Sequence, residues 1–545
     1  MSADRLVAAV SVKPAIARSA IRRDLLRLGG LTLIVALIIA LLTHQPGYTD
    51  AYYYLNGAAQ IAHGQGLTDR ALWTYIGAPA GLPVPGFLYW MPLASLAEAL
   101  PVWIAGGTLG LFRAGQIVGI LCVVALSVIG YGLGLQIGGT RRTGWLAGLL
   151  TVFSGFFLAY WTNTDTFALY AVIGSLALWC IGKGRASQRL IWWIAAGLLA
   201  GLAHLTRADG LLFLITLLIA ALWNQWRSVR NGWRAVLVGL IGYGVVMTPW
   251  FVRNLGAVGS LLPVGGFQSA WFSSYDQIAA YPPGASLTDF LATGPGPLLQ
   301  TRLTALSLSV QTFVAVEGLI VLAPLILLAL WRRRSDPTLS GVILYALGLH
   351  ALMTLVFALA GMRGGLLHSA AALVPFWAAL GITGLDDALR WAAKRRRWPL
   401  KQAQRVFGIA LLGWAVAFSA LTGLKLISGW NVANAAYTQI GPALSADAVI
   451  MVNDPPAFTY QSGLAAVVVP DSSPDVIPAL VARYGVTYLL LDSNRTVPFA
   501  ALYAGQDSFP FLQVLSLPAG VTSDPANPLQ LYRVLSPTPT AKETP

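Results

Sequence analysis

The chain is poor in charge. Of its 545 residues only 10% are Asp, Glu, Lys or Arg, whereas 56% are hydrophobic. A soluble globular protein carries about 25% charged residues, so the composition excludes the soluble class. The apolar runs are continuous and near the ~20 residues that a helix needs to cross a bilayer, whereas barrel strands would alternate. The sequence therefore predicts a polytopic α-helical membrane protein.

Cysteine is also scarce, and several kinds of site are missing. The two cysteines, Cys122 and Cys180, lie inside apolar runs, which argues against a disulfide framework. We find no glycine-rich phosphate loop, no spaced set of metal ligands and no Ser-His-Asp arrangement. The sequence therefore indicates no certain cofactor and no metal ligands, and it leaves the use of a divalent metal open.

About eleven apolar runs are expected to cross the membrane. They lie near 28–43, 115–137, 143–161, 166–182, 190–206, 210–226, 235–251, 306–331, 338–360, 368–385 and 406–427. Arginines precede the first run without an obvious cleavage site, so this run is expected to be a retained anchor. The loops between the runs then alternate between the two faces of the membrane.

Positive charge sets the orientation. With residues 1–27 placed in the cytoplasm as a basic N-terminus, about two thirds of the 35 Lys and Arg residues fall in inward-facing segments. This is the positive-inside pattern, so the net charge of +14 indicates membrane orientation rather than nucleic-acid binding. The transmembrane domain is expected over 28–427, with long outer loops at 44–114 and 252–305.

The tail is a different kind of sequence. Three short runs rich in β-branched residues predict strands: "AVIMV" (448–452), "AAVVVP" (465–470) and "VTYLLLD" (486–492). Between the last two, "SSPDVIPALVARYG" predicts a helix that ends at Gly485. Strand, helix and strand at this spacing predict a small extracytoplasmic α/β domain over 428–535. The last segment, 536–545, is expected to be disordered.

Polar residues that are costly at membrane depth gather on the outer side. Charged groups in such positions mark functional sites by default. At the outer ends of spans or in outer loops lie Asp50, Asp69, Arg70, Asp165, Arg207, Asp209, Arg253, Asp276, Arg363 and His368. The pair Asp386–Asp387 falls at an inner end and is expected to partner the basic cluster that follows it. We therefore expect a site at the outer boundary of the membrane.

Asp50 follows the first span in "GYTDAYYYLNGAAQIAHGQGL" (47–67). Ala51, Leu55 and Ala58 are spaced for one apolar helix face. Such a helix would lie along the membrane surface, with Tyr52 to Tyr54 at headgroup level. Asp50 is expected either to cap this helix or to act as a base, and one role does not exclude the other.

Two arginines suit a phosphate. Arg207 in "LTRADG" and Arg253 in "TPWFVRN" each end a span on the outer side, and the planar guanidinium binds oxyanions in a bidentate way. Contact with lipid headgroups is the alternative. Asp165 is expected to cap a helix. The further candidates for substrate contact are Tyr53, Tyr54, Asp165, Arg363 and His368.

Together these features resemble the GT-C glycosyltransferases. Within that superfamily, the chain is similar to the protein O-mannosyltransferase and lipid A aminoarabinose transferase group, which is glycosyltransferase family 39-like. The similarity lies in the order and sidedness of its features: a cytoplasmic N-terminus, a first span, a large outer loop that opens on Asp50 and tyrosines, and then "LTRADG" and "PWFVRN" at outer ends. The resemblance covers about 1–430. Two departures are that Ala51 follows Asp50 where an acidic pair is frequent, and that there is no β-trefoil domain.

The resemblance implies a transfer reaction at the outer leaflet. The donor would be a sugar on a polyprenyl phosphate, and the acceptor, a lipid, glycan or protein, stays open. Asp50 would be the catalytic carboxylate and take a proton from the acceptor, with inversion at the anomeric carbon. Arg207 and Arg253 would hold the leaving phosphate.

Two other classes remain as alternatives. A lipid or sugar transporter or flippase would place charges near the midplane and repeat its two halves, and neither feature is evident. A non-catalytic cell-envelope assembly protein would act through its tail and would tolerate loss of the Asp50 carboxylate. A glycosyltransferase would not tolerate that loss.

Overall fold

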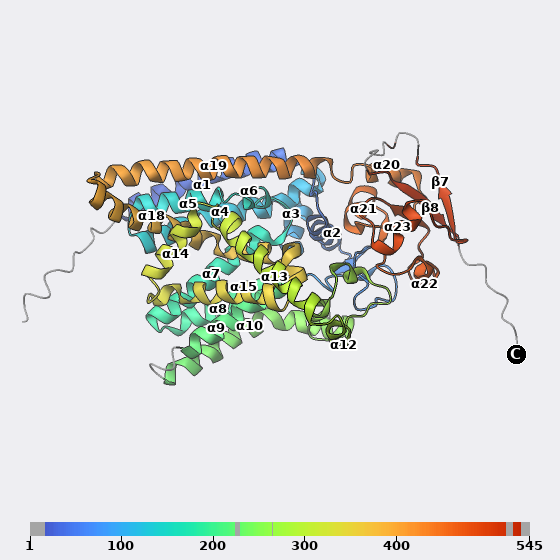
Figure 1. Ribbon diagram of the computed structural model, residues 1–545, viewed down its shortest axis with the longest axis horizontal. Helices are drawn as coiled ribbons and strands as arrows, with labels where there is room; N and C mark the ends of the chain where they lie inside the picture. The colour runs from blue at the N-terminus through green and yellow to red at the C-terminus, as the bar shows by residue number, and fades with distance from the viewer. Residues whose placement is uncertain (1–16, 224–228, 264, 519–520, 522–526, 536–545) are drawn as a thin grey trace, which may run out of the picture.

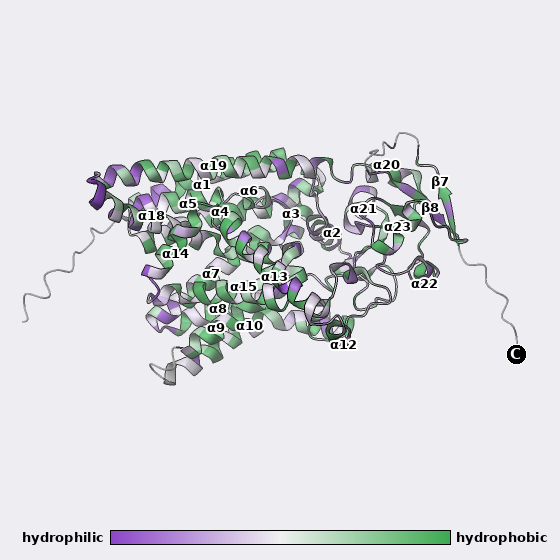
Figure 2. Cartoon of the chain, in the orientation of Figure 1, coloured by the Kyte–Doolittle hydropathy of each residue, from purple (hydrophilic) through white to green (hydrophobic). Residues whose placement is uncertain are grey.

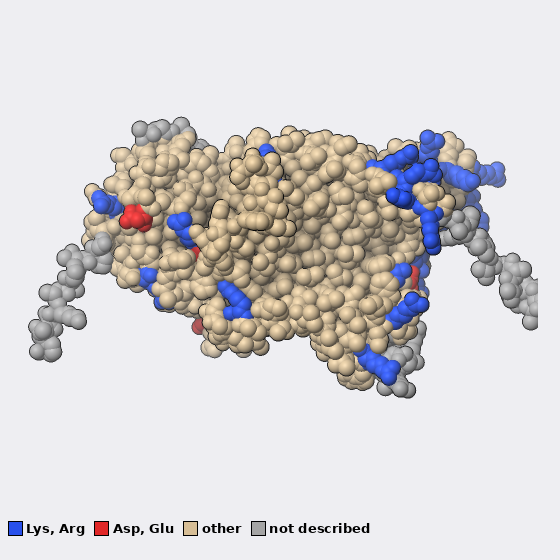
Figure 3. Space-filling model, turned by 180° about the vertical axis from the view of Figure 1, so that it is seen from behind, with Lys and Arg blue, Asp and Glu red and all other residues tan. Residues whose placement is uncertain are grey.

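The computed structural model describes residues 17–223, 229–263, 265–518, 521 and 527–535. The chain forms a helical bundle with a small sheet at one end (Figure 1). The bundle is mainly hydrophobic along its length (Figure 2). Lys and Arg gather at one end of it, beside a wide band that carries almost no charge (Figure 3). The predicted disordered segment 536–545 and most of the N-terminal segment lie outside the described residues.

Within the described ranges, seven helices are long and apolar enough to cross a membrane. They are Arg18–Leu42, Leu111–Gly138, Thr166–Ser187, Gly232–Val258, Pro337–Leu355, Ala358–Arg396 and Leu400–Ala443. A bent pair, Pro295–Glu317 with Leu322–Arg332, adds an eighth, and three apolar helices are shorter: Leu93–Leu109, Leu190–Thr206 and Ala208–Trp223. The predicted polytopic helical membrane fold is therefore confirmed.

The helices of the bundle follow the chain in order. Their bounds are α1 Arg18–Leu42, α2 Thr49–Ala62, α3 Leu93–Leu109, α4 Leu111–Gly138, α5 Arg141–Val152, α6 Phe157–Tyr160, α7 Thr166–Ser187, α8 Leu190–Thr206, α9 Leu211–Trp223, α10 Val229–Val258, α13 Pro295–Gln311, α14 Leu322–Arg332, α15 Ser340–Leu355, α17 Leu366–Ala370, α18 Val374–Arg396 and α19 Leu400–Val432. The segment 44–114, which we expected to be a long outer loop, contains the helix predicted at Asp50, which is α2, and a second helix, α3, which was not predicted.

Two predicted spans are not continuous helices. The span at 143–161 is divided into α5 and α6, and Gly155 between them has a φ of +66°. The span at 306–331 is bent by 96° between α13 and α14. Hydropathy detects apolar length but not backbone direction, so the sequence could not reveal either break.

The buried faces of α1 and α19 contain several small residues. On α19, Ala415, Ser419 and Gly423 are buried at a spacing of four. On α1, Ala36 and Ala40 are buried, while the Leu and Ile side chains on its other faces are largely exposed. Small residues let membrane helices approach closely, and exposed aliphatic side chains suit lipid.

The acidic pair Asp386–Asp387 is held by arginines. Arg142 donates to Asp386 at 2.9 Å, and Arg333 donates to Asp387 at 2.7 Å, with Arg390 as a second partner of Asp387. The predicted pairing with basic residues is confirmed, although Arg142 and Arg333 come from earlier segments. The pair is therefore part of the framework of the bundle.

A six-stranded sheet forms the far end of the molecule. Its strands are β2 Ala71–Leu72, β4 Val449–Val452, β5 Ala465–Val468, β6 Tyr488–Leu491, β7 Leu512–Leu515 and β8 Gln530–Val534. The order is β2-β5-β4-β6-β8-β7, and the first four strands are parallel. Strands β4 to β6 are the three that the sequence predicted, and the predicted helix is α22 Ile477–Tyr484, which ends at Gly485. The helix α21 Pro455–Ser462 was not predicted.

The first outer loop supplies one strand of this sheet. β2 pairs with β5 so that Ala71 lies opposite Ala466. The Tyr75 hydroxyl donates to the carbonyl of Val468, and Asn56 of α2 donates to the carbonyl of Pro456 at 2.9 Å. The tail is therefore joined to the loop that carries Asp50.

Candidate active site

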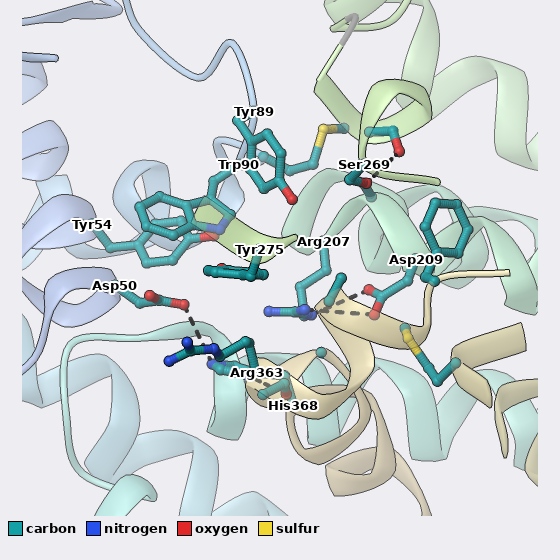
Figure 4. A pocket seen from close by; sticks show the side chains of 18 residues that line it. Asp50, Tyr54, Tyr89, Trp90, Arg207, Asp209, Ser269, Tyr275, Arg363 and His368 are labelled. Carbon is teal, nitrogen blue, oxygen red and sulfur yellow. Dashed lines mark hydrogen bonds and ion pairs between the residues drawn. The ribbon is translucent and has the colours of Figure 1, made fainter. Parts of the chain in front are cut away.

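Asp50 lies in the first turn of α2. Tyr48 occupies the N-cap position, and no side chain caps the helix. The predicted capping role of Asp50 is therefore wrong, and its carboxylate faces a cavity instead (Figure 4). A negative charge in the first turn of a helix is favoured by the helix dipole.

The three tyrosines of α2 are buried inside the protein, so their expected position at headgroup level is wrong. The tail packs on Tyr52, whose ring centroid lies 5.2 Å from that of Tyr460. The Tyr53 hydroxyl accepts a hydrogen bond from the backbone N–H of Phe87 at 2.9 Å. Tyr54 lines the cavity, and its buried hydroxyl has no hydrogen-bond partner among the described residues.

The cavity has a volume of about 140 Å³. Its polar lining comes from segments far apart in the sequence, namely Asp50, Tyr54, Arg207, Asp209, Ser269, Arg363 and His368, and its aromatic lining is Tyr89, Trp90, Tyr275 and Phe357. These side chains converge on one space (Figure 4). A concave site with a few convergent polar groups is the usual form of a ligand site.

Arg207 follows the last residue of α8 and is held in place by a carboxylate. Its Nε donates to Asp209 Oδ1 at 3.1 Å, and both side chains are nearly buried. The Ser369 hydroxyl donates to the other oxygen of Asp209. This arrangement fixes the guanidinium while its remaining N–H groups can reach a ligand.

Arg363 sits on a break in the helix backbone. The turn Gly361–Gly365 is π-helical, and Gly364 has a φ of +119°, a backbone angle that residues other than glycine rarely adopt. The guanidinium of Arg363 lies 5.2 Å from the ring centroid of Tyr275. Within the described ranges no carboxylate forms an ion pair with Arg363, so its charge is available to an anion.

His368 bridges two carboxylates. Its Nε2 lies 3.1 Å from Asp165 Oδ2 and 3.7 Å from Asp50 Oδ2, and its Nδ1 lies 2.9 Å from the carbonyl of Gly364. The carbonyl of Gly364 can only accept, so Nδ1 donates to it, while Nε2 faces the two carboxylates.

Asp165 has the predicted capping role and a second contact. Its carboxylate accepts from the backbone N–H of Thr166 at the start of α7, and from the Tyr48 hydroxyl at 2.8 Å. Burial alone would raise the pKa of Asp165, but His368 and these hydrogen bonds hold it below the usual value. Asp165 is therefore an anion that contacts His368.

The pKa of the Asp50 carboxyl lies close to neutral pH. Burial, together with the charge of Asp165, raises the pKa of the Asp50 carboxyl to about 6, although His368 and Arg207 oppose the rise. A carboxylate with a pKa near the working pH is well matched to taking up a proton. Asp50 is also partly open to the cavity, with 26% of its side chain exposed.

The expected positions of Arg253 and Tyr53 do not fit the cavity. Arg253 donates to the carbonyls of Leu67 and Gly86 at 3.2 and 2.9 Å, and stacks over Trp250. Neither Arg253 nor Tyr53 is among the residues that line the cavity. The expected phosphate role of Arg253 therefore does not fit this geometry, because its donors bind the first outer loop to α10.

One group of ligand atoms has the spacing of a cation site. Asp50, Asp165 and His368 each offer one ligand atom, and these atoms lie within 4.8 Å of one another. A metal there would need a deprotonated Nε2 of His368 and would displace the contact between this nitrogen and Asp165 Oδ2 at 3.1 Å.

Several lining residues were not predicted. Trp90 and Tyr89 belong to "FLYWMP" (87–92), and Tyr275 lies in the long outer loop 252–305. The sequence placed Asp209 among the outer charges but did not reveal that it holds Arg207. An aromatic cluster beside a Pro in an outer loop was the available signal for Trp90, since aromatic groups in loops frequently serve binding.

One family model matches part of the chain. Residues 99–251 match the family model described as dolichyl-phosphate-mannose-protein mannosyltransferase. That range includes Asp165, Arg207 and Asp209 but not Asp50. No curated protein sequence matches the chain.

Solved structures resemble almost the whole chain. ArnT from Cupriavidus metallidurans bound to undecaprenyl phosphate is 13% identical, with a TM-score of 0.58 over 94% of this chain and 99% of that one. Its apo form gives a TM-score of 0.54 at the same identity and coverage. The Archaeoglobus fulgidus oligosaccharyltransferase in complex with Zn and sulfate is 14% identical, with a TM-score of 0.52 over 85% of this chain and 68% of that one. At such identities the likeness establishes a shared fold.

Proposed function

We propose that this chain, which has the fold of the GT-C membrane glycosyltransferases, transfers a sugar from a polyprenyl-phosphate donor to an acceptor at the outer membrane face. The undecaprenyl phosphate bound by the structurally similar ArnT supports this choice of donor. Asp50 is the general base in this proposal.

One observation carries the proposal: a carboxylate and two guanidinium groups face the same cavity. Asp50 enters it from α2, Arg207 from the end of α8 and Arg363 from the π-helical turn (Figure 4). A transfer from a sugar phosphate needs a base on one side of the reacting carbon and positive charge on the other.

The chemical step follows from these roles. The acceptor O–H or N–H gives its proton to the Asp50 carboxylate as the acceptor atom bonds to the anomeric carbon. The bond from that carbon to the phosphate oxygen breaks, and the lipid phosphate leaves with the electron pair. Because one displacement occurs, the configuration at the anomeric carbon inverts.

Arg207 and Arg363 are the groups that stabilise the leaving phosphate. The negative charge on the bridging oxygen grows as the bond breaks, and preoriented cationic donors lower the free energy of that state. Asp209 keeps Arg207 oriented. His368 lies between Asp165 and Asp50 and opposes the rise in the pKa of Asp50 that Asp165 and burial cause.

The orientation is part of the proposal. The chain is a multi-pass membrane protein, and the basic residues at the end of the bundle opposite the sheet support a cytoplasmic N-terminus over 1–27 (Figure 3). The transmembrane domain over 28–427 would then open outward, and the tail over 428–535 would lie outside the cytoplasm.

Asp50→Asn tests the central assignment. Loss of the base should lower the rate of transfer by about 10²–10⁴-fold, while purified protein should keep its yield and melting temperature. The measurement is incubation with a panel of polyprenyl-phosphate sugars, followed by mass spectrometry of the released lipid phosphate and of the sugar product.

A matched change serves as the control. Asp289 is an exposed carboxylate in the outer loop, bonded to Ser286, so Asp289→Asn should leave the rate unchanged. Normal transfer by the Asp50→Asn protein would sink the assignment of Asp50 as the base.

A further inference from the structure

A second chamber lies against the first. It has a volume of about 330 Å³, and Asp50, Trp90, Tyr275 and Arg363 line both spaces. The Asp50 carboxylate therefore separates two chambers. The first contains Arg207, whereas the second extends toward the sheet.

The second chamber lies at the carboxyl ends of four parallel strands. Its lining includes Trp73 after β2, Val468 at the end of β5, Asn453 after β4 and Asn494 after β6. In open α/β sheets, ligands bind in the crevice at the carboxyl ends of the strands. The position of the chamber is therefore that of a ligand site of the sheet, and the ligand would lie next to Asp50.

The charges on its walls are balanced. Two carboxylates, Asp50 and Asp276, and two guanidinium groups, Arg363 and Arg495, line it. Arg495 already donates to the carbonyl of Ser493 at 2.9 Å and stacks over a tyrosine ring. A chamber of this kind does not select an anion, and it suits a neutral polar ligand.

The remaining walls suit hydroxyl groups and the apolar faces of a ring. The side-chain amides of Asn453 and Asn494 have no partner among the described residues, and each amide can both donate and accept. Trp73 and Trp90 stack with their ring centroids 3.8 Å apart, which presents an aromatic surface for packing. Hydroxyl groups need amide and carboxylate partners, and sugar C–H faces need an aromatic one.

The walls are held together by backbone contacts. The Thr74 hydroxyl donates to the carbonyl of Ile278 at 2.6 Å, and the Asp471 N–H donates to the carbonyl of Ala279 at 2.9 Å. Thr496 Oγ1 donates to the carbonyl of Pro470 at 2.7 Å. The segments 44–114 and 252–305 and the tail thus form one preformed chamber, which reduces the entropy lost when a ligand binds.

We infer that this chamber binds the acceptor, and that the acceptor presents a neutral, hydroxyl-rich glycan. The inference rests on the proposed function. The glycan lies on the tail side of Asp50 and points one hydroxyl at the carboxylate, while the sugar donor occupies the arginine side. An extended peptide that paired with the sheet would need an unpaired strand edge, and of the four strands beside the chamber only β2, two residues long, lies at an edge.

Binding of neutral disaccharides to the full-length protein in detergent tests this inference. Saturation-transfer NMR would use cellobiose, mannobiose and N-acetyllactosamine as probes, with a Ser/Thr hexapeptide as the competing class. At least one disaccharide should bind, and Asn453→Ala/Asn494→Ala should weaken its affinity at least tenfold. Asp276→Asn gives a second test, should the double variant fold poorly.

The control is Gln513→Ala, an exposed position on β7, which should bind as the unchanged protein does. Absence of disaccharide binding, unchanged affinity in the chamber variants, or binding of the hexapeptide in place of the sugars would each overturn the inference. A negative result in this binding test can be told apart from failure of the proposed function. An Asp50→Asn protein should still bind disaccharide but transfer nothing, and normal transfer by that protein would reject the base alone.

Discussion

Arg207, Arg253 and Arg363 are the same chemically, but their guanidinium groups have different partners. Arg253 donates to two backbone carbonyls, whereas Arg207 is oriented by Asp209 and Arg363 has no carboxylate partner among the described residues. An arginine can bind a phosphate only with N–H groups that the protein has left available. The partners of each residue therefore decide its role.

Arg363→Gln and Arg253→Gln should give opposite results. The first change removes a cation that faces the cavity, and kcat should fall by about 10²-fold with little change in melting temperature. The second should leave kcat unchanged but lower stability by about 1–3 kcal/mol, because the part-buried carbonyl of Gly86 loses its arginine donor and that of Leu67 keeps only the Gly86 N–H. Donor-dependent kinetics and thermal unfolding measure both effects. Loss of catalysis on changing Arg253 alone would restore it as the phosphate ligand.

The rate of transfer should depend on the ionisation of Asp50. Its pKa is about 6, and only the ionised form can take a proton. The value of kcat/KM should therefore fall about tenfold per pH unit below pH 6 and reach a plateau above pH 7. The charged groups that set this midpoint are Asp165, His368, Arg207 and Asp454. A pH–rate profile measures it.

The pH–rate profile of a His368→Gln protein tests the direction of this shift. His368 lowers the pKa of Asp50, so His368→Gln should move the midpoint to higher pH. A profile that stays in place, or moves to lower pH, would contradict the influence of His368 on Asp50. Because the direction is fixed in advance, a general loss of activity would not be mistaken for this effect.

Breaks in helices position the site at the scale of elements. The π-helical turn before α17 carries Arg363, and Gly364 provides the backbone conformation that the turn requires. Beyond the turn, α17 carries His368 back toward Asp165. A continuous helix through this region would place the two side chains differently.

Gly364→Ala tests the turn. The Cβ would be strained at a φ of +119°, so stability should fall by about 1 kcal/mol or more, and kcat/KM should fall as Arg363 moves. Gly413→Ala on α19 is the control, because a Cβ there meets nothing within 4 Å. Thermal unfolding and kinetics of both proteins measure the effects. Equal behaviour of the two variants would exclude a special role for the turn.

The sequence predicted the helices and strands better than the contacts between them. Apolar length and charge bias revealed the helical membrane fold, and β-branched runs revealed β4 to β6. The same signals could not place Arg253, because the outer end of a span does not say which way its side chains point. The joint position of Trp90 and Tyr275 depends on how two loops dock, which no local pattern encodes.

The whole molecule has a charge asymmetry along its long axis. Lys and Arg concentrate at the end of the bundle opposite the sheet, and a broad band without charge lies between (Figures 1 and 3). This distribution favours the sheet on the outer side, because positively charged segments stay in the cytoplasm. The site, at the junction of bundle and sheet, would then open outward.

Labelling of introduced cysteines checks this orientation. In a Cys122→Ala/Cys180→Ala background, Gln513→Cys in the tail should react with an impermeant maleimide in intact cells. Lys401→Cys, at the other end of the bundle, should react only after lysis, and both positions are exposed. The reverse pattern would invert the topology.

The pairing of β2 with the tail has a consequence for biosynthesis. The Tyr75 hydroxyl and its acceptor at Val468 are 393 residues apart along the chain, so the first loop is synthesised long before its partner. Its strand edge stays unpaired until β5 follows, because such non-local contacts form late. A chain that stops after α19 would lack the wall beside Asp50 that the ends of β4, β5 and β6 supply. Synthesis of residues 449–491 therefore decides when that wall is complete.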